Sequence, residues 1–287
     1  MSNRRDGIRV KNIDGMHSLM PHIMPKRTAA NVYINTKIDV TELVKYLEKL
    51  RKKDEYKSIT FFHLFCTAIG KTAYNRPLMN RFIVNKRFYD RKDVKISFVA
   101  KKEFTDKAEE SMQVLTIKEN DDLFSISEQT RKSVHKLRSS QEHGVDKLMV
   151  LLGKMPKWLR SILWGIIKFG DNHDLLPTSL TKDLLYYSTV IVANLGSIDC
   201  GSIYHHLTDF GTNSVFMVIG QIKDEVVAMD GKPTVRKMCE FGLNIDERIA
   251  DGFYFIKTLK LFEYILQNPH LLEENANMPI EVPKVRS

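Results

Sequence analysis

The sequence predicts an α/β fold, in which helices pack over a mixed β-sheet. Segments such as residues 241–246 alternate apolar and polar side chains, which is the period of a half-buried strand. Segments such as residues 253–266 carry a wide apolar stripe at helical spacing. The chain has 287 residues, enough to bury a core as one large domain or as two modest ones.

The first part of the chain is a basic, methionine-rich arm, residues 1–27, which Pro21 and Pro25 interrupt. After it the patterns predict the following elements: strands over residues 32–38, 82–89, 94–101 and 112–117, a helix capped by Thr41, a central apolar helix over residues 58–75, and a polar helix over residues 123–138.

The second part is organised around the segment from Phe241 to Leu272. If its strand continued by two residues beyond Asp246, Glu247 would lie on the apolar face. The elements predicted around it are strands over residues 187–194 and 215–221, a hairpin of residues 226–229 and 234–246 turning at Asp230-Gly231, a helix capped by Asp251 and ended by Asn268-Pro269, and a polar, extended tail over residues 273–287.

Residues 145–170 are the compositional outlier, because basic residues are interleaved with many apolar ones and both tryptophans of the chain, Trp158 and Trp164, lie here. We predict an amphipathic helical insertion that Pro156 divides into two helices. We expect these helices to pack on the protein and to leave part of the tryptophan surface exposed. Such a segment can cover an apolar groove or a subunit contact, or make a peripheral membrane contact.

The overall charge of +9 and the isoelectric point near 9.3 suit a phosphate-bearing ligand, a membrane surface or simply a solvated basic surface. We expect no nucleic-acid partner. The three cysteines are far apart and have no metal-ligand spacing, which indicates a reducing compartment. The N-terminus lacks the apolar core of a signal peptide, and no apolar run is long enough to span a membrane, so we expect a cytoplasmic protein.

The motif D-E-R-I-A-D-G, residues 246–252, carries a family resemblance. It resembles the D-H-R-x-x-D-G of the catalytic domain of dihydrolipoamide acyltransferases, and the H-H-x-x-x-D-G of the related chloramphenicol acetyltransferases. The strand that ends in I-D-V-T, residues 38–41, and the helix after it resemble the start of that domain, and V-A-N-L-G, residues 192–196, resembles its T-I-S-N-L-G. The resemblance covers residues 28–272 as one acyltransferase-like domain and includes no lipoyl domain, so we expect a free-standing relative.

The resemblance implies a chloramphenicol acetyltransferase-like fold, a homotrimer with its active site between subunits, and coenzyme A as the carrier of the acyl group. It also implies the roles of particular residues. The family's catalytic base is a histidine, and Glu247 stands in its place. The family's hydroxyl group at the oxyanion falls near Val192 and Ala193, which have none, so Asn194 is the local polar candidate.

Two candidates for the base remain open. Glu247 can serve if desolvation makes it a stronger base, and the alternative is a structural ion pair with Arg248 or Arg27. The second candidate is the adjacent pair His205 and His206, whose alternative is a packing or capping role. No metal-ligand set accompanies these histidines, and we expect no metal.

Four further residues are expected to shape the site without reacting: Asp246, Arg248, Asp251 and Gly252. The resemblance implies that Asp251 holds the turn through a salt bridge with Arg248 or Arg27. The hypothesis is therefore transfer of an acyl group from acyl-coenzyme A to a small acceptor with an atypical base. The alternative is a catalytically inactive trimer that acts as a binding or scaffolding protein.

Overall fold

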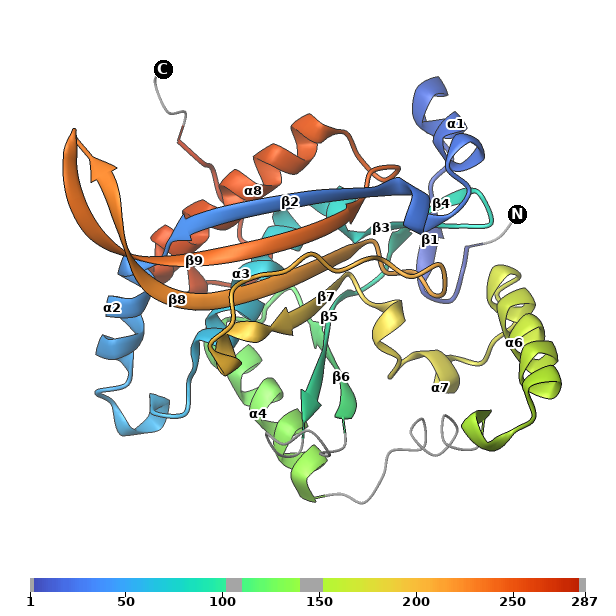
Figure 1. Ribbon diagram of the computed structural model, residues 1–287, viewed down its shortest axis with the longest axis horizontal. Coiled ribbons are helices and arrows are strands. Elements are labelled where there is room, and N and C mark those ends of the chain that lie inside the picture. The colour runs from blue at the N-terminus through green and yellow to red at the C-terminus, as the bar shows by residue number, and fades with distance from the viewer. Residues whose placement is uncertain (1–2, 102–109, 140–151, 284–287) are drawn as a thin grey trace.

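The computed structural model of the chain describes residues 3–101, 110–139 and 152–283. Its central feature, among these residues, is a six-stranded sheet in the order β2-β9-β8-β7-β5-β6 (Figure 1). β7 runs parallel to both of its neighbours, and the other strand pairs are antiparallel. The predicted mixed sheet is confirmed. Its strands are β2 (Asn31–Asp39), β5 (Val94–Lys101), β6 (Glu110–Ile117), β7 (Val190–Asn194), β8 (Val215–Met229) and β9 (Lys232–Asp246).

Helices cover one face of this sheet and enclose the main core. The central apolar helix is confirmed as α3, in which residues 63–73 are all buried. The Phe241 ring of β9 makes edge contacts with Phe65 of α3 and Phe262 of α8, so burial of these aromatic rings joins the sheet to both helices. The covering helices are α2 (Thr41–Leu50), α3 (Phe61–Asn75), α4 (Leu123–Ser139) and α8 (Gly252–Gln267).

The other face of the sheet is covered by chain without long helices, residues 185–189 and 195–214, on either side of β7. A smaller core forms there from Leu185, Ile191, Leu207, Phe216 and Val218. The covering chain lies very close to β9, because a Cβ atom at Gly242 would come within 2.4 Å of the Ile203 carbonyl oxygen. Glycine is therefore required at position 242 by this close approach.

A separate small sheet has the order β1-β4-β3, with strands β1 (Gly7–Arg9), β3 (Arg81–Val84) and β4 (Arg87–Arg91). The prediction of one strand over residues 82–89 is wrong, because Asn85 and Lys86 make a tight turn there with φ of 48° and 60°. Positive φ at both central residues is what a type I′ turn requires. The sequence did not indicate this turn because its second central residue is Lys86, where a glycine is usual. The helix α1 (Gly15–Ile23) follows β1.

The hairpin of β8 and β9 is much longer than predicted and projects beyond the rest of the sheet (Figure 1). Its turn is at Asp230 and Gly231, as predicted, with φ of 50° and 76°. Near the tip the facing residues Val226 and Val235 are 70% and 61% exposed. The hairpin therefore presents an apolar surface to solvent.

The insertion contains α6 (Lys157–Asn172), which Pro156 precedes, and the short helix α7 (Thr178–Thr181) follows it. Residues 152–154 are also helical, and the predicted range 145–151 lies outside the described residues. Figure 1 shows α6 at the edge of the molecule opposite the long hairpin.

The described part of the C-terminal tail after Glu273, residues 274–283, has no helix or strand and turns at residues 276–277, and it lies against the body of the protein. The Lys71 ammonium, on a fully buried side chain, donates to the carbonyl oxygens of Glu274 and Asn275 at 3.0 and 2.7 Å. The Ala276 backbone N–H donates to the Asp121 carbonyl oxygen at 2.7 Å. The tail thus closes the end of the helical layer.

Candidate functional site

The strand β9 ends at Asp246, and Glu247 begins a turn. The Glu247 backbone N–H donates to the Ala30 carbonyl oxygen at 2.9 Å, and the Ile249 N–H donates back to the Asp246 carbonyl at 3.2 Å. The predicted continuation of the strand is therefore wrong. Glu247 is half-buried in the turn and does not lie on the apolar face of the sheet.

Asp246 is the centre of the charged network at this turn. Its carboxylate is fully buried and accepts hydrogen bonds from Nε and Nη2 of Arg248, each at 2.7 Å. The Arg27 Nε atom lies 3.8 Å from the same carboxylate. The expected ion pair of Glu247 with either arginine is therefore wrong, because Asp246 holds both.

The buried Arg27 guanidinium also joins the turn to the chain that covers the sheet. It donates to the carbonyl oxygens of Thr208 and Gly211 at 2.6 and 3.0 Å. Burial lowers the pKa of Arg27, and the attraction of Asp246 opposes this effect. Arg27 thus fixes residues 208–211 relative to the end of β9.

Asp251 caps α8, as predicted, with its Oδ1 accepting from the Tyr254 N–H at 2.7 Å. The expected salt bridge of Asp251 with Arg248 or Arg27 is wrong, since Asp246 occupies both cations and Asp251 is exposed. Gly252 is the first residue of α8, and a Cβ atom there would meet nothing within 4 Å. It is not needed for a close backbone approach.

His205 packs against the sheet, whereas its neighbour His206 is exposed. The His205 ring stacks on Phe216 with a centroid distance of 4.0 Å and an angle of 3° between planes. The Asn244 side-chain amide donates to the His205 carbonyl oxygen at 2.6 Å. Since Asn244 precedes Asp246 by two residues on β9, the structure brings His205 to the same end of the sheet as Glu247.

Asn194 lies at the end of β7 and pairs with Ile219 of β8. Ile245, two residues before Glu247, pairs instead with Val215 of β8. These partners are four residues apart on one strand, which at about 3.3 Å per residue is roughly 13 Å. Within one chain, the structure therefore does not bring Asn194 together with Glu247.

Sequence reasoning missed a group of buried polar side chains beside the turn. The Asn31 Oδ1, Asn244 Oδ1 and Ser214 Oγ atoms are buried and have no hydrogen-bond partner among the described residues. Strand pairing places Asn31 opposite Asp246 in β2 and β9. The alternation of β9 put Asn244 on the face opposite Phe241, but alternation alone does not distinguish a solvated face from a buried polar one.

Two cavities flank the turn. One, of about 220 Å³, is lined by Arg27 and Arg248 and also by Lys26, Lys86 and Lys168, with Asp171 and Asp209 as its acidic residues. The other, of about 310 Å³, is lined by Asp251 and Tyr254 on its α8 side. The excess of cations around the first suits an anionic ligand such as a phosphate. Among the residues that the structure describes, no group of three or more His, Cys, Asp or Glu side chains could hold a metal ion.

Comparison with known proteins shows the family of the chain. The model of the 2-oxoacid dehydrogenases acyltransferase (catalytic domain) family matches residues 8–143 and 177–273. The chain belongs to this family. The lipoamide acyltransferase component of the branched-chain alpha-keto acid dehydrogenase complex of Bacillus subtilis (strain 168) is 26% identical over 235 residues. That match covers 80% of this chain and 45% of the relative, so the chain spans less than half the length of the relative.

Solved structures show the same acyltransferase fold. The cubic core of the pyruvate dehydrogenase multienzyme complex matches with a TM-score of 0.61 at 14% identity, covering 92% of this chain and 93% of that one. A chloramphenicol acetyltransferase matches with a TM-score of 0.54 at 10% identity, covering 91% and 98%. The predicted chloramphenicol acetyltransferase-like fold is confirmed.

The family match also leaves one part of this chain unmatched. It leaves out residues 144–176, which contain the whole of α6. The predicted insertion therefore coincides with chain that the family model does not account for. Among the described residues, no helix is long and apolar enough to cross a membrane.

Proposed function

We propose that the chain transfers an acyl group from acyl-coenzyme A to a thiol, hydroxyl or amine acceptor, with Glu247 as the general base. Membership of the acyltransferase family supports the reaction class. The observation that supports Glu247 is its place between two residues that neutralise each other. Asp246 and Arg248 pair through two hydrogen bonds, and the Glu247 carboxylate makes no ion pair with any described residue.

In this reaction Glu247 removes the proton from the acceptor as the acceptor attacks the thioester carbonyl carbon. The tetrahedral intermediate then collapses, the bond from carbon to sulfur breaks, and coenzyme A leaves as its thiolate, which takes up a proton. His205 is the second candidate, because it lies at the same end of the sheet.

The site is proposed to form between copies of the chain, as a homotrimer. Asn194, the candidate for the oxyanion, is separated from Glu247 by roughly 13 Å or more along the sheet. Groups that act on one reacting carbon must lie within a few ångströms of it. The two residues therefore meet only if one copy supplies Glu247 and another supplies Asn194. A solved structure with this fold is the cubic core of a multienzyme complex, which supports assembly.

Coenzyme A is proposed to place its phosphates near the basic cavity beside Arg27 and Arg248. Lys26, Lys86 and Lys168 on its wall make no ion pair with an acid among the described residues, so they are available to phosphate oxygens. Residues Asp171 and Asp209 are already engaged by Arg5 and Thr28.

The alternative is an assembly without catalysis that binds coenzyme A or another protein. Its support is the environment of residues 192 and 193, where buried Val192 and its neighbour Ala193 offer no hydroxyl group. The network of Asp246 with both arginines stabilises the turn whether or not the chain reacts.

The decisive experiment measures turnover and binding with the full chain. Acetyl-coenzyme A and longer acyl thioesters are offered with thiol, hydroxyl and amine acceptors, dihydrolipoamide included, and the acylated product is detected by mass spectrometry. Sedimentation gives the oligomeric state, and calorimetry gives coenzyme A affinity. Product formation by a trimer supports the enzyme. Binding without product for any pair supports the alternative, and a monomer that neither binds nor reacts overturns both.

A further inference from the structure

The helix α6 presents an apolar face to solvent. Trp158, Ile162, Ile166 and Phe169 are 66%, 54%, 61% and 59% exposed. Their spacing of four, four and three residues places them on one side of the helix. An apolar stripe of this kind is normally turned toward the core of a protein, so its outward position calls for a partner.

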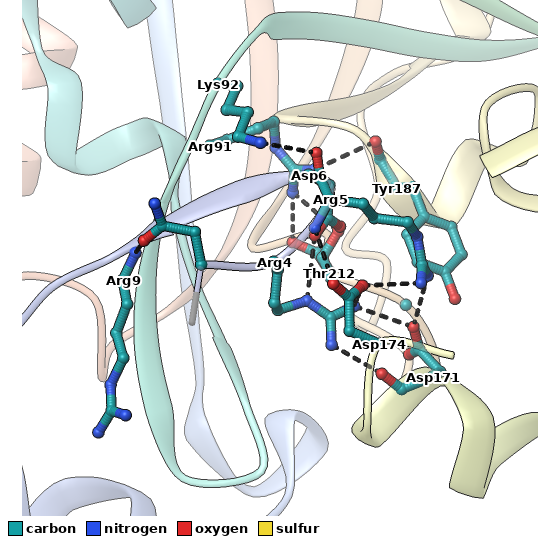
Figure 2. Close-up of polar contacts among 12 residues, drawn as sticks. Arg4, Arg5, Asp6, Arg9, Arg91, Lys92, Asp171, Asp174, Tyr187 and Thr212 are labelled. Atoms are coloured by element: carbon teal, nitrogen blue, oxygen red, sulfur yellow. Dashed lines mark hydrogen bonds and ion pairs between the residues drawn. The ribbon is translucent and has the colours of Figure 1, made fainter. Parts of the chain in front are cut away.

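The outward position follows from the way in which α6 is attached. Its other side and its C-terminal end hold it to the body, where Arg4 and Arg5 donate to the Asp171 carboxylate at 3.1 and 3.2 Å (Figure 2). Arg5 also makes a 2.8 Å ion pair with Asp174, just beyond the helix. Because Arg4 and Asp171 are buried, this attachment is well shielded from water.

A second contact fixes the rotation of the helix. The Trp164 ring packs on Phe210 with a centroid distance of 4.8 Å. Trp164 and Asp171 are seven residues apart, so they lie on one side of α6, and Trp158 and Ile162 lie on another. The side chains that contact the body are thus different from those of the exposed stripe.

The side of α6 away from the stripe and the turn before the helix carry positive charge. Lys154, Lys157 and Arg160 are exposed and make no ion pair with an acid among the described residues. The acid in α6, Asp171, is neutralised by Arg4 and Arg5. Lys157 and Arg160 precede Trp164 by seven and four residues, so they lie on its side of the helix. A basic face together with an apolar face of tryptophan, isoleucine and phenylalanine is typical of helices that bind anionic lipid surfaces.

We propose that α6 binds the chain to the surface of an anionic lipid bilayer. The helix lies in the plane of the interface, with Trp158, Ile162 and Ile166 inserted among the acyl chains near the headgroups and the basic residues on the phosphates. The binding is peripheral, because α6 has 16 residues and does not span the bilayer. The family model omits residues 144–176, so the family's shared architecture does not supply this surface with a partner. This inference does not depend on the acyl-transfer proposal.

Vesicle flotation with the full chain tests the proposal. Vesicles of phosphatidylcholine alone are compared with vesicles that contain roughly one third phosphatidylglycerol. We expect at least about tenfold more protein on the anionic vesicles, with weaker binding as salt rises above about 0.15 M. The triple variant Trp158→Ser, Ile162→Ser, Ile166→Ser should lose at least about tenfold in binding while remaining folded, because the three side chains face solvent.

A matched control removes an equally exposed aromatic ring elsewhere. Phe253 of α8 is 70% exposed, and Phe253→Ser should float like the wild type. Trp164→Phe leaves Trp158 as the remaining tryptophan of the chain, so a shift of its fluorescence to shorter wavelength with anionic vesicles reports insertion. Flotation that survives in the triple variant, or is absent in the wild type, overturns the proposal. So does a triple variant that dissociates a lipid-free oligomer, since the face would then join copies of the chain.

Discussion

The Arg248 guanidinium donates two hydrogen bonds of 2.7 Å to the carboxylate of Asp246, two residues before it in the chain. Arg248 also donates to the Met24 carbonyl oxygen at 2.8 Å, and so ties the N-terminal arm to the end of β9. The pair lies on either side of Glu247 and leaves that carboxylate unpaired. Asp246 and Arg248 of the motif therefore have a structural role, which does not depend on whether the chain is catalytic.

Replacing Asp246 by Asn tests whether its ion pairs stabilise the fold. The change keeps the shape but leaves the buried cations Arg248 and Arg27 without their counter-charge, which we expect to lower the free energy of unfolding by about 3–5 kcal/mol. Denaturant titration measures the effect. The control is Asp224→Asn, which breaks an exposed pair with Lys237 and should cost less than about 1 kcal/mol. Equal effects of the two changes would show that the buried network is not stabilising.

Replacing Gly242 by Ala tests the close packing of residues 199–206 on the sheet. The new methyl group would overlap the Ile203 carbonyl oxygen, so the covering chain must move and stability should fall by about 1–3 kcal/mol. Gly165→Ala is the control, because a Cβ atom there meets nothing within 4 Å and alanine favours a helix by about 1 kcal/mol. The midpoint temperature of thermal unfolding should therefore fall in Gly242→Ala and rise in Gly165→Ala. An unchanged midpoint in Gly242→Ala would show that residues 199–206 do not pack this closely on the sheet.

The stability of the protein should fall in mild acid because of His63. Burial, and then the charges of Arg131 and Arg51, lower the pKa of His63 to about 4 from an ordinary value of 6.5. Below pH 6.5 the unfolded chain binds a proton that the folded chain does not, so the free energy of unfolding falls as pH drops toward 4. Between pH 6.5 and 4.5 this amounts to roughly 2–3 kcal/mol.

The variant His63→Gln isolates that effect. The Thr60 backbone N–H donates to the His63 Nδ1 atom at 3.2 Å, and a glutamine oxygen can accept the same bond. We expect the stability of this variant to depend less on pH between 6.5 and 4.5, as followed by denaturant titration at several pH values. His270→Gln, at an exposed position, serves as the control and should keep the acid dependence of the wild type.

The sequence could predict those parts of the fold whose periodicity is set by burial on one side. The strand that ends at Asp246 and the helix that Asp251 caps are examples, since each alternates or repeats cleanly. The hairpin at Asn85 and Lys86 could not be predicted, because its turn uses no glycine. The orientation of α6 could not be predicted either. Its apolar stripe does not indicate that the buried Asp171 attaches the other side of the helix to the protein.

The candidate site was predicted in part for a similar reason. The motif predicted the positions of the turn and of the Asp251 cap. It did not predict which acid pairs with Arg27 and Arg248. Asp246 is the last residue of its strand and points into the protein, whereas Asp251 sits at an exposed helix end. Asp246 lies beside both guanidinium groups inside the protein, so it is the acid that pairs with them.

The variant Glu247→Gln separates the two candidate bases. It keeps the volume of the side chain and removes the proton acceptor, so it should lower acyl transfer by roughly a hundredfold or more if Glu247 is the base. The fold should survive, because the Glu247 carboxylate makes no ion pair with a described residue and its backbone bond to Ala30 is unaffected. Turnover and coenzyme A affinity are measured on the same preparation, so that a loss of rate at unchanged affinity identifies a chemical role.

His205→Phe is the matched variant for the rival base, since it retains a ring to stack on Phe216 and removes both ring nitrogens. If Glu247 is the base, this variant should keep turnover within a few-fold of the wild type. The opposite pattern, with full activity in Glu247→Gln and a large loss in His205→Phe, would transfer the role to the histidine.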